Sequence, residues 1–267
     1  MSPIRLALLL CDTPIQPVVD EHGDYTRIFD KLFRDSCPPG VTYVMDSFDV
    51  RNKMEYPEDI DQYDGLVMTG SAASAYENFE WINRLVAYVA SVAETKPNVK
   101  IIGICFGHQI VARALGKDCV PNNGIWEAGL VTIELTETGK QLFGGRDELN
   151  IQQMHRDHIP EIPKGCELLA STSVCKNQGF VRFTPGTTSR RPKDIQIFTV
   201  QGHPEFTEGI VSKVVDLRAS TGVIDQPTAQ RARERASWRN DGVSVIGKVI
   251  WQILGVEPSV KHVPLTM

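Results

Sequence analysis

The chain has 267 residues, of which 42% are hydrophobic and 23% charged, and its formal net charge is −5. This composition excludes disordered, collagen-like and coiled-coil chains, and the acidic balance argues against a dedicated nucleic-acid-binding protein. Six cysteines without a CxxC pair exclude a disulfide scaffold and a zinc ribbon, so we expect free thiols in the reducing environment of the cytoplasm.

The first apolar run, Ile4–Leu10, ends before Asp12 and lacks the small-residue cleavage site of a signal peptide. Its continuous hydrophobicity predicts a strand of a parallel sheet that is covered on both faces. No apolar run in the sequence approaches the roughly 18 residues that span a bilayer, so we expect no membrane segment.

Strand and helix patterns alternate over the first 115 residues. This alternation is typical of an α/β protein with a doubly wound, mostly parallel sheet, whose site lies at the carboxyl ends of the strands. The predicted strands are Ile4–Leu10, Val41–Phe48, Gly65–Met68 and Val99–Ile104, and the predicted helices are Asp24–Phe33, Asn78–Ala93 and Gly107–Leu115.

The middle of the chain has short strand patterns with little helix between them, which predicts an antiparallel extension of the same sheet or a small second sheet. We expect Thr184–Lys193 to be an exposed loop. The chain then returns to helix patterns, so we expect a single domain with a core at about 4–220, a helical extension at about 221–267 and an irregular tail from Pro258. The predicted strands are Gly129–Leu135, Leu149–Met154, Glu167–Ser171, Phe180–Phe183 and Ile195–Val200, and the helices are Thr207–Leu217, Gln226–Trp238 and Val243–Ile253.

The stretch Ile-Ile-Gly-Ile-Cys-Phe-Gly-His-Gln at 101–109 brings a buried strand into a helix at Cys105. Gly103 and Gly107 leave room for the sharp turn of a nucleophile elbow. The start of the helix favours a thiolate over a thiol, and the N–H of Phe106 can receive a developing oxyanion. The pattern predicts a catalytic nucleophile, and a buried structural cysteine is the alternative.

A second polar pattern, Gln-Gly-His-Pro-Glu-Phe at 201–206, directly follows a predicted strand. His203 and Glu205 are one residue apart, so an extended backbone points both side chains to the same side. Pro204 is expected to hold this segment extended. An imidazole fixed by a carboxylate suits acid–base catalysis. A surface pair is the alternative, but both patterns emerge at the same sheet edge, which favours a catalytic role.

Together, Gly-Ile-Cys-Phe-Gly-His-Gln at 103–109 and Gly-His-Pro-Glu at 202–205 resemble the two signatures of class I glutamine amidotransferases. The resemblance covers roughly residues 4–206. Without a fused synthetase, the chain is similar to free-standing plant and fungal γ-glutamyl peptidase-like proteins. Further similar elements are Met-Thr-Gly-Ser at 68–71, Ala-Arg-Ala-Leu-Gly at 112–116, Trp-Glu-Ala-Gly at 126–129 and Met-His-Arg-Asp at 154–157.

The resemblance implies a Cys105–His203–Glu205 triad that forms a γ-glutamyl thioester, with no cofactor and no metal. It implies an oxyanion hole of backbone N–H groups at Phe106 and Ser71, with Gly70 shaping the loop. Many family members carry a second glycine where this chain has Ser71. The residues that the resemblance places around the glutamyl group are Gln109, Met154 and His155.

The implied function is a cysteine-dependent hydrolase of γ-glutamyl amide bonds, acting on γ-glutamyl peptides or glutathione-type conjugates. The first alternative is a glutaminase subunit that delivers ammonia to a separate synthetase, and the second is a non-catalytic binding or regulatory module. We expect a small γ-glutamyl substrate and neither nucleic acid nor membrane, and we keep a homo-oligomer open. Leaving-group contacts are expected from the loops Asn122–Gly129 and Thr184–Lys193.

Several weaker signals have structural explanations. His108 lies on the helix after the nucleophile and should point away from the thiol. His155 and His158 are spaced like metal ligands, but a loop-stabilising role is favoured. Trp126 either lines the pocket or covers the core. The arginines at 231, 233, 235 and 239 form a solvated face or a docking surface for an acidic partner. Packing or incidental thiols are expected at Cys11, Cys37, Cys119, Cys166 and Cys175.

Overall fold

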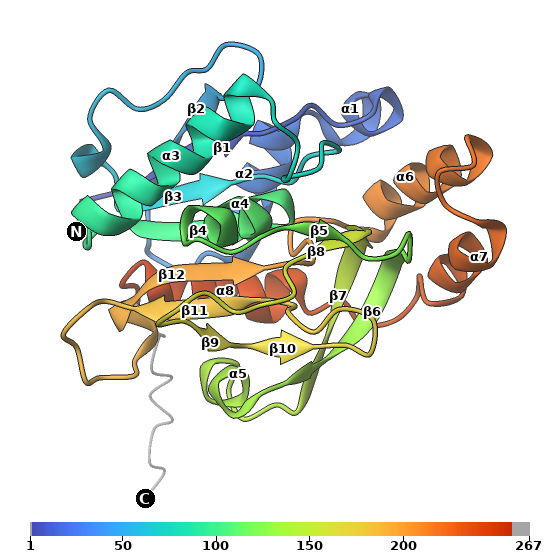
Figure 1. Cartoon of the computed structure of the whole chain (residues 1–267). Coiled ribbons are helices and arrows are strands. Elements are labelled where there is room, and N and C mark those ends of the chain that lie inside the picture. Colours follow the sequence, from blue (N-terminus) through green and yellow to red (C-terminus); the bar gives the residue numbers. More distant parts are fainter. Residues whose placement is uncertain (1, 258–267) are drawn as a thin grey trace, which may run out of the picture.

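A computed structural model describes residues 2–257, and the predicted tail from Pro258 lies outside them (Figure 1). Its centre is a seven-stranded sheet in the order β2-β1-β3-β4-β12-β11-β9. The first five of these strands are parallel, and β11 and β9 extend the sheet in the antiparallel sense. The strands are β1 (Ile4–Leu10), β2 (Tyr43–Asp49), β3 (Gly65–Met68), β4 (Lys100–Ile104), β9 (Glu167–Leu168), β11 (Phe180–Phe183) and β12 (Ile195–Val200).

Helices cover both faces of this sheet because alternate residues of each strand point to opposite sides. Leu6 and Leu8 of β1 belong to the hydrophobic cluster that includes α2 and α8. Ala7 and Leu9 of the same strand belong to the cluster that includes α3 and α4. The doubly wound α/β class predicted from the alternating pattern is therefore confirmed (Figure 1).

The helices follow the predicted periodicity with small shifts at their ends. Asp24 caps α2, since its side chain accepts the Arg27 N–H at 3.0 Å. The pattern did not predict α1, which buries only Val18, or the short α5. The helices are α1 (Gln16–His22), α2 (Tyr25–Ser36), α3 (Glu80–Thr95), α4 (Phe106–Ala114), α5 (Glu137–Leu142), α6 (Glu208–Ser220), α7 (Gln226–Glu234) and α8 (Lys248–Ile253), with short 3₁₀ turns at Ile60–Gln62 and Pro192–Asp194.

A second, antiparallel sheet of order β10-β6-β7 stands beside the first, so both arrangements expected for the middle of the chain are present. The strand expected at Glu167–Ser171 is interrupted at Leu169. The Leu169 N–H donates to the Gly179 carbonyl, and the Leu169 carbonyl accepts the Thr136 N–H. These strands are β6 (Glu127–Leu135), β7 (Glu148–His155) and β10 (Ala170–Ser171), and a further small pair is formed by β5 (Val120–Pro121) and β8 (Asp157–His158).

The C-terminal helices pack into the core. The predicted helix Val243–Ile253 begins as a π-helix at Gly242–Gly247 and continues as α8. Trp251 of α8 is fully buried, and its indole N–H donates to the Phe33 carbonyl at 3.2 Å. The backbone of Gly242 lies so close to the Pro204 carbonyl that a Cβ atom would not fit.

The arginines at 231, 233, 235 and 239, in α7 and just after it, are only partly a solvated face. Three of them are exposed, but Arg235 donates to the Ala128 carbonyl at 2.9 Å and also to the Leu130 carbonyl, which holds α7 against β6. Arg233 pairs with Asp216 of α6 at 2.7 Å. Among the residues that the structure describes, no helix has the length and hydrophobicity needed to cross a membrane.

Candidate active site

Cys105 lies in a strained turn between β4 and α4. Its backbone has φ 52° and ψ −104°, a conformation that a residue with a side chain rarely adopts. A Cβ atom on Gly103 would lie 2.6 Å from the Gly107 carbonyl oxygen, and one on Gly107 would lie 2.7 Å from Cβ of Met68. Both glycines are therefore required by close backbone approach, as the elbow pattern predicts.

His203 follows β12, and its N–H donates to the Gln152 carbonyl of β7 at 2.8 Å. The backbone is extended at His203, which forms an antiparallel bridge with Gln152. The expectation of an extended course through Glu205 is wrong, because the Phe206 N–H donates to the His203 carbonyl at 3.3 Å across a turn with Pro204 and Glu205 at its centre. Proline suits the second position of such a turn as well as an extended chain. The turn still brings His203 Nδ1 to 2.8 Å from Glu205 Oε1.

The His203 ring is closely packed. It stacks on Phe206 with a centroid separation of 4.0 Å and an interplanar angle of 4°. A Cβ atom on Gly70 would lie 2.8 Å from His203 Cε1. Burial opposes the imidazolium, but the Cys105 thiolate and the Glu205 carboxylate outweigh it and raise the pKa of His203 to about 10. His203 and Glu205 are thus hydrogen-bonded, and the charge on His203 is coupled to both Glu205 and Cys105.

The loop expected to supply the second oxyanion N–H is held by Asp12. One Asp12 oxygen accepts the Ala72 N–H at 2.6 Å and the Ser71 hydroxyl at 3.1 Å, and the other pairs with Arg51. Ser71 does not have a positive φ, so serine adopts this turn without backbone strain. The Ser71 hydroxyl therefore helps to anchor the loop.

Aromatic contacts connect this loop to the start of α4. Phe106 is the first residue of α4, so its N–H has no acceptor inside the helix. Its ring stacks on Trp81 at 5.4 Å, and the Arg51 guanidinium lies 6.0 Å from the Trp81 centroid. Since Arg51 pairs with Asp12, the two segments that carry the expected oxyanion N–H groups are fixed by one chain of contacts.

Cys105 opens into a cavity of about 290 Å³. Gln109, Met154 and His155, the residues expected around a glutamyl group, all line it. The Gln109 amide donates to the Asp157 carbonyl and to Gln201 Oε1, each at 3.1 Å, so its position is fixed.

Trp126 also lines this cavity, between two guanidinium groups. Arg218 of α6 lies 4.9 Å and Arg156 lies 5.7 Å from its ring centroid. Burial lowers the pKa of Arg218, and the electrostatic effect of Cys105, which raises it, does not compensate. Among the described residues, Arg218 has no carboxylate partner, and Arg156 has only Asp157 at 3.9 Å. The cavity therefore offers positive charge to an anionic ligand.

Sequence reasoning missed Arg156 and Arg218 as pocket residues, because each is one ordinary arginine among many. The expected contribution from Thr184–Lys193 is not seen, since none of its residues lines the cavity, whereas the Asn122–Gly129 loop contributes Trp126.

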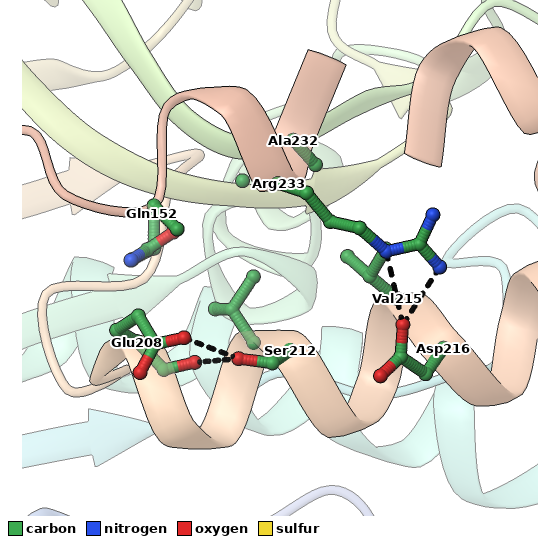
Figure 2. A pocket seen from close by; sticks show the side chains of 10 residues that line it. Gln152, Glu208, Ser212, Val215, Asp216, Ala232 and Arg233 are labelled. Carbon is green, nitrogen blue, oxygen red and sulfur yellow. Dashed lines mark hydrogen bonds and ion pairs between the residues drawn. The ribbon is translucent and has the colours of Figure 1, made fainter. Parts of the chain in front are cut away.

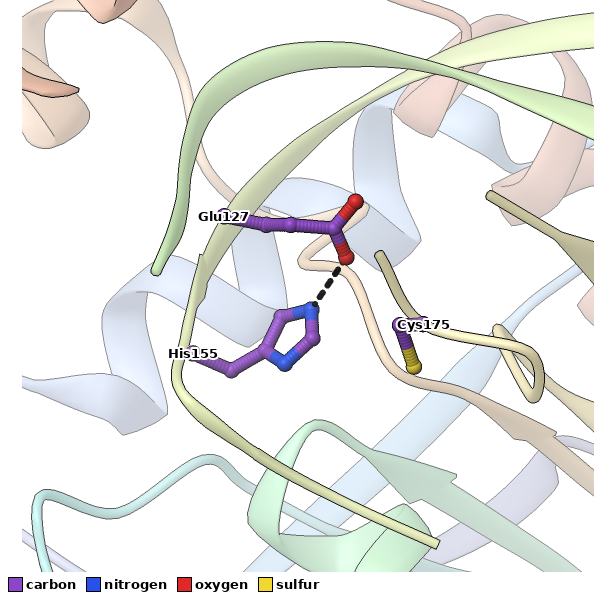
Figure 3. A group of neighbouring side chains, drawn as sticks. All are labelled: Glu127, His155 and Cys175. Carbon is purple, nitrogen blue, oxygen red and sulfur yellow. Dashed lines mark ion pairs between the residues drawn. The ribbon is translucent and has the colours of Figure 1, made fainter. Parts of the chain in front are cut away.

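Two histidines near the site are structural. His108 Nδ1 lies 2.8 Å from Thr199 Oγ1, and burial, together with nearby His155, lowers the pKa of His108 to about 3. His155 Nε2 lies 3.0 Å from Glu127 Oε2 (Figure 3). Burial opposes the charge on Glu127, but bonding to His155 outweighs it and lowers the pKa of Glu127.

A metal would have to displace existing bonds in this group. The ligand atoms of Glu127, His155 and Cys175 lie within 4.8 Å of one another and are all buried (Figure 3). However, Glu127 also accepts the Thr172 hydroxyl at 2.7 Å and the Gln178 amide at 2.6 Å. These bonds and the pairing with His155 occupy both oxygens, which identifies Glu127 as a structural anchor between β6 and β7.

The other five cysteines lie in surroundings that favour the neutral thiol. Burial raises the pKa of Cys11 and Cys175 to about 12 and that of Cys166 to about 11, and it raises the pKa of Cys119 still further. Burial also raises the pKa of Cys37. At neutral pH these groups remain thiols.

A separate cavity of about 290 Å³ lies between α6, α7 and the β6–β7 sheet (Figure 2). Val215, Ala232 and Gln152 are among the residues that line it, and no member of the triad does. Gln152 of β7, whose carbonyl accepts the His203 N–H, lines this cavity, which is separate from the cavity at Cys105.

Comparison with known proteins agrees with this geometry. The family model described as Glutamine amidotransferase class-I matches residues 25–215. The chain is 35% identical to a glutamine amidotransferase-like protein of Schizosaccharomyces pombe, over 87% of this chain and 91% of that protein. It is 28% identical to gamma-glutamyl peptidase 3 of Arabidopsis thaliana, over 94% of each chain. A solved glutamine amidotransferase of Thermotoga maritima has the same fold, with a TM-score of 0.70 at 17% identity, over 96% of this chain and 100% of that one.

Proposed function

The chain belongs to the class I glutamine amidotransferase family, and from this membership we propose that it is a thiol hydrolase of γ-glutamyl amide bonds, acting on γ-glutamyl peptides. The observation that carries the proposal is the charge-coupled group of Cys105, His203 and Glu205, in which Cys105 lines a cavity of about 290 Å³. Relatives named gamma-glutamyl peptidases along nearly the whole chain support a peptide rather than free glutamine as substrate.

The proposed reaction is acyl transfer through Cys105. The Sγ thiolate attacks the γ-carbonyl carbon, and the oxyanion is held by the N–H groups of Phe106 and Ser71. His203 then protonates the leaving nitrogen, and Glu205 keeps its ring oriented through Nδ1. Water, deprotonated by His203, hydrolyses the γ-glutamyl thioester, which releases glutamate and regenerates the Cys105 thiolate and the protonated His203.

Charge in the cavity supports an anionic substrate. A γ-glutamyl peptide carries one carboxylate on the glutamyl group and another at its C-terminus. Arg156 and Arg218 place two guanidinium groups against Trp126 in the cavity that Cys105 opens into. Arginine binds carboxylates with paired, charge-assisted hydrogen bonds, so both suit this role.

The test is hydrolysis of a panel of γ-glutamyl dipeptides and glutamine by the purified protein, with released amine and glutamate quantified by chromatography. We expect turnover by the natural chain, a glutamyl adduct on Cys105 by mass spectrometry, and loss of both in Cys105→Ala. Cys166→Ala is the matched control and should retain activity. Retained activity in Cys105→Ala would overturn the proposal, and turnover of glutamine alone would favour a glutaminase.

A further inference from the structure

A second cleft, of about 60 Å³, adjoins the catalytic cavity. Ser71, Ala72, Met154 and Arg218 line both spaces, so the two spaces adjoin along these residues. The residues proposed for catalysis are distributed over both spaces. Cys105 and Gln109 line the first cavity, whereas His203 lines the second cleft.

The walls of the second cleft are mainly aliphatic and aromatic. Ile15 and Val18 come from the region of α1, and Ile210 and Val214 come from α6. Phe206 directly follows the turn at Pro204 and Glu205. Asp12 is its acidic member, and both of its carboxylate oxygens are already bonded to Arg51, Ser71 and Ala72. Apart from Arg218, which it shares with the cavity at Cys105, and His203, the cleft therefore offers mainly apolar surface and no free carboxylate.

The position of His203 in the second cleft determines on which side the leaving amine lies, and this argument rests on the proposed function. As Cys105 Sγ bonds to the γ-carbonyl carbon, the C–N bond must break. The nitrogen keeps the electron pair and takes the proton from His203, leaving as a neutral amine, and water later supplies the oxygen and hydrogen that complete the glutamate and thiol. The general acid must lie within hydrogen-bond reach of that nitrogen, so the amine's substituents lie on the side of His203.

We infer that the second cleft binds the side chain of the residue on the amine side of the scissile bond, and that it selects a small aliphatic side chain there. The volume sets the size limit. At about 60 Å³ the cleft has about a fifth of the volume of the cavity at Cys105, which favours a side chain of a few carbons over an aromatic ring. Glycine, or the ammonia released from glutamine, leaves the apolar walls uncovered.

The experiment compares kcat/KM for γ-Glu-Gly, γ-Glu-Ala, γ-Glu-Val, γ-Glu-Phe and glutamine with the unmodified full chain. In known pockets, one buried methylene changes kcat/KM by at least about 10-fold. We therefore expect kcat/KM for γ-Glu-Val to exceed that for γ-Glu-Gly by at least about 10-fold. We expect γ-Glu-Phe and glutamine to fall below γ-Glu-Val. Equal values for the glycine, alanine and valine substrates, or a preference for glutamine, would overturn the inference.

Variants then locate the selectivity. Val214→Phe fills the cleft and should reduce the ratio of γ-Glu-Val to γ-Glu-Gly to about 1, while Leu217→Phe changes an exposed position on the same helix and should leave it unchanged. Thermal melting checks that both variants fold. If Val214→Phe is folded and keeps the natural ratio, the inference is wrong. Complete inactivity of the natural chain on every γ-glutamyl amide would instead refute the proposed function, so the two failures are distinct.

Discussion

Substituting Gly103 by alanine should disable the elbow more than it harms any other part of the fold. The new Cβ atom would lie 2.6 Å from the Gly107 carbonyl oxygen, 2.7 Å from its carbonyl carbon and 2.9 Å from the His108 nitrogen. All three neighbours belong to the backbone at the start of α4, so no side chain can rotate away. The first turn of α4 has to move relative to β4.

The size of this movement sets the expected cost. Ordinary van der Waals contact begins near 3.4 Å, so relieving the closest contact requires a displacement of about 0.8 Å. Overpacking of this kind costs about 1–3 kcal/mol, and we expect the upper end because only backbone can yield. A misplacement of about 1 Å in a catalytic group costs about 100-fold in rate, so we expect a loss in kcat of at least that size.

Gly116→Ala is the matched control at the opposite end of α4. Its φ is +81° and no heavy atom lies within 4 Å of the added Cβ, so the substitution adds backbone strain without a clash. Strain of this type costs about 1 kcal/mol. Urea unfolding and γ-glutamyl dipeptide hydrolysis would be measured for both variants. Equal stability losses, or kcat for Gly103→Ala within about 3-fold of the control, would refute the reasoning.

Four further predictions concern the charges of the site. Because the Cys105 thiolate is the main group that raises the pKa of His203 from 6.5 to about 10, Cys105→Ser should lower it, as followed by NMR titration of the His203 ring; an unchanged value would contradict this coupling. The stabilisation from protonated His203 is complete below pH 6.5 and is lost as pH rises through about 10, so the natural chain should lose more unfolding free energy over that window than His203→Gln does. Asp12→Asn weakens the anchor of the oxyanion loop and should reduce kcat by about 10- to 100-fold with little change in KM, whereas a rise in KM alone would argue for a role in binding. Arg218→Met removes a charge-assisted contact of about 1.5–3 kcal/mol, so KM should rise by about 10- to 150-fold, and unchanged KM would exclude Arg218 from substrate binding.

The fold could be predicted wherever burial dominates. The bounds predicted for β1, β3, β11 and β12 coincide with those in the structure, since a strand covered on both faces is a continuous apolar run. The hydrophobic pattern did not predict α1, because this helix buries only Val18 and has a proline in its first turn. It also failed at Leu169, where the chain passes from one sheet to the other without any change in hydrophobicity.

The candidate site could be predicted where backbone geometry demands particular residues. Gly103 and Gly107 mark Cys105 because larger residues would collide with backbone there. The turn at His203 was not predicted, because Pro204 is compatible with both an extended chain and a turn. Arg218 and Asp12 could not be predicted either, since their roles come from helix and loop placement that no local pattern encodes.

The burial of Trp251 has a consequence for how the chain is made. Its indole donates to the Phe33 carbonyl, a contact between residues 218 positions apart, and it packs on the face of the sheet where α2 lies. During synthesis, β1 and α2 leave the ribosome long before α8 exists, so this apolar face stays uncovered until nearly all of the described chain has been translated. Contacts of such long sequence separation slow folding. The growing chain therefore passes through a long interval in which chaperones can bind it. The turn that follows His203, against which Gly242 packs, reaches its final packing only near the end of translation.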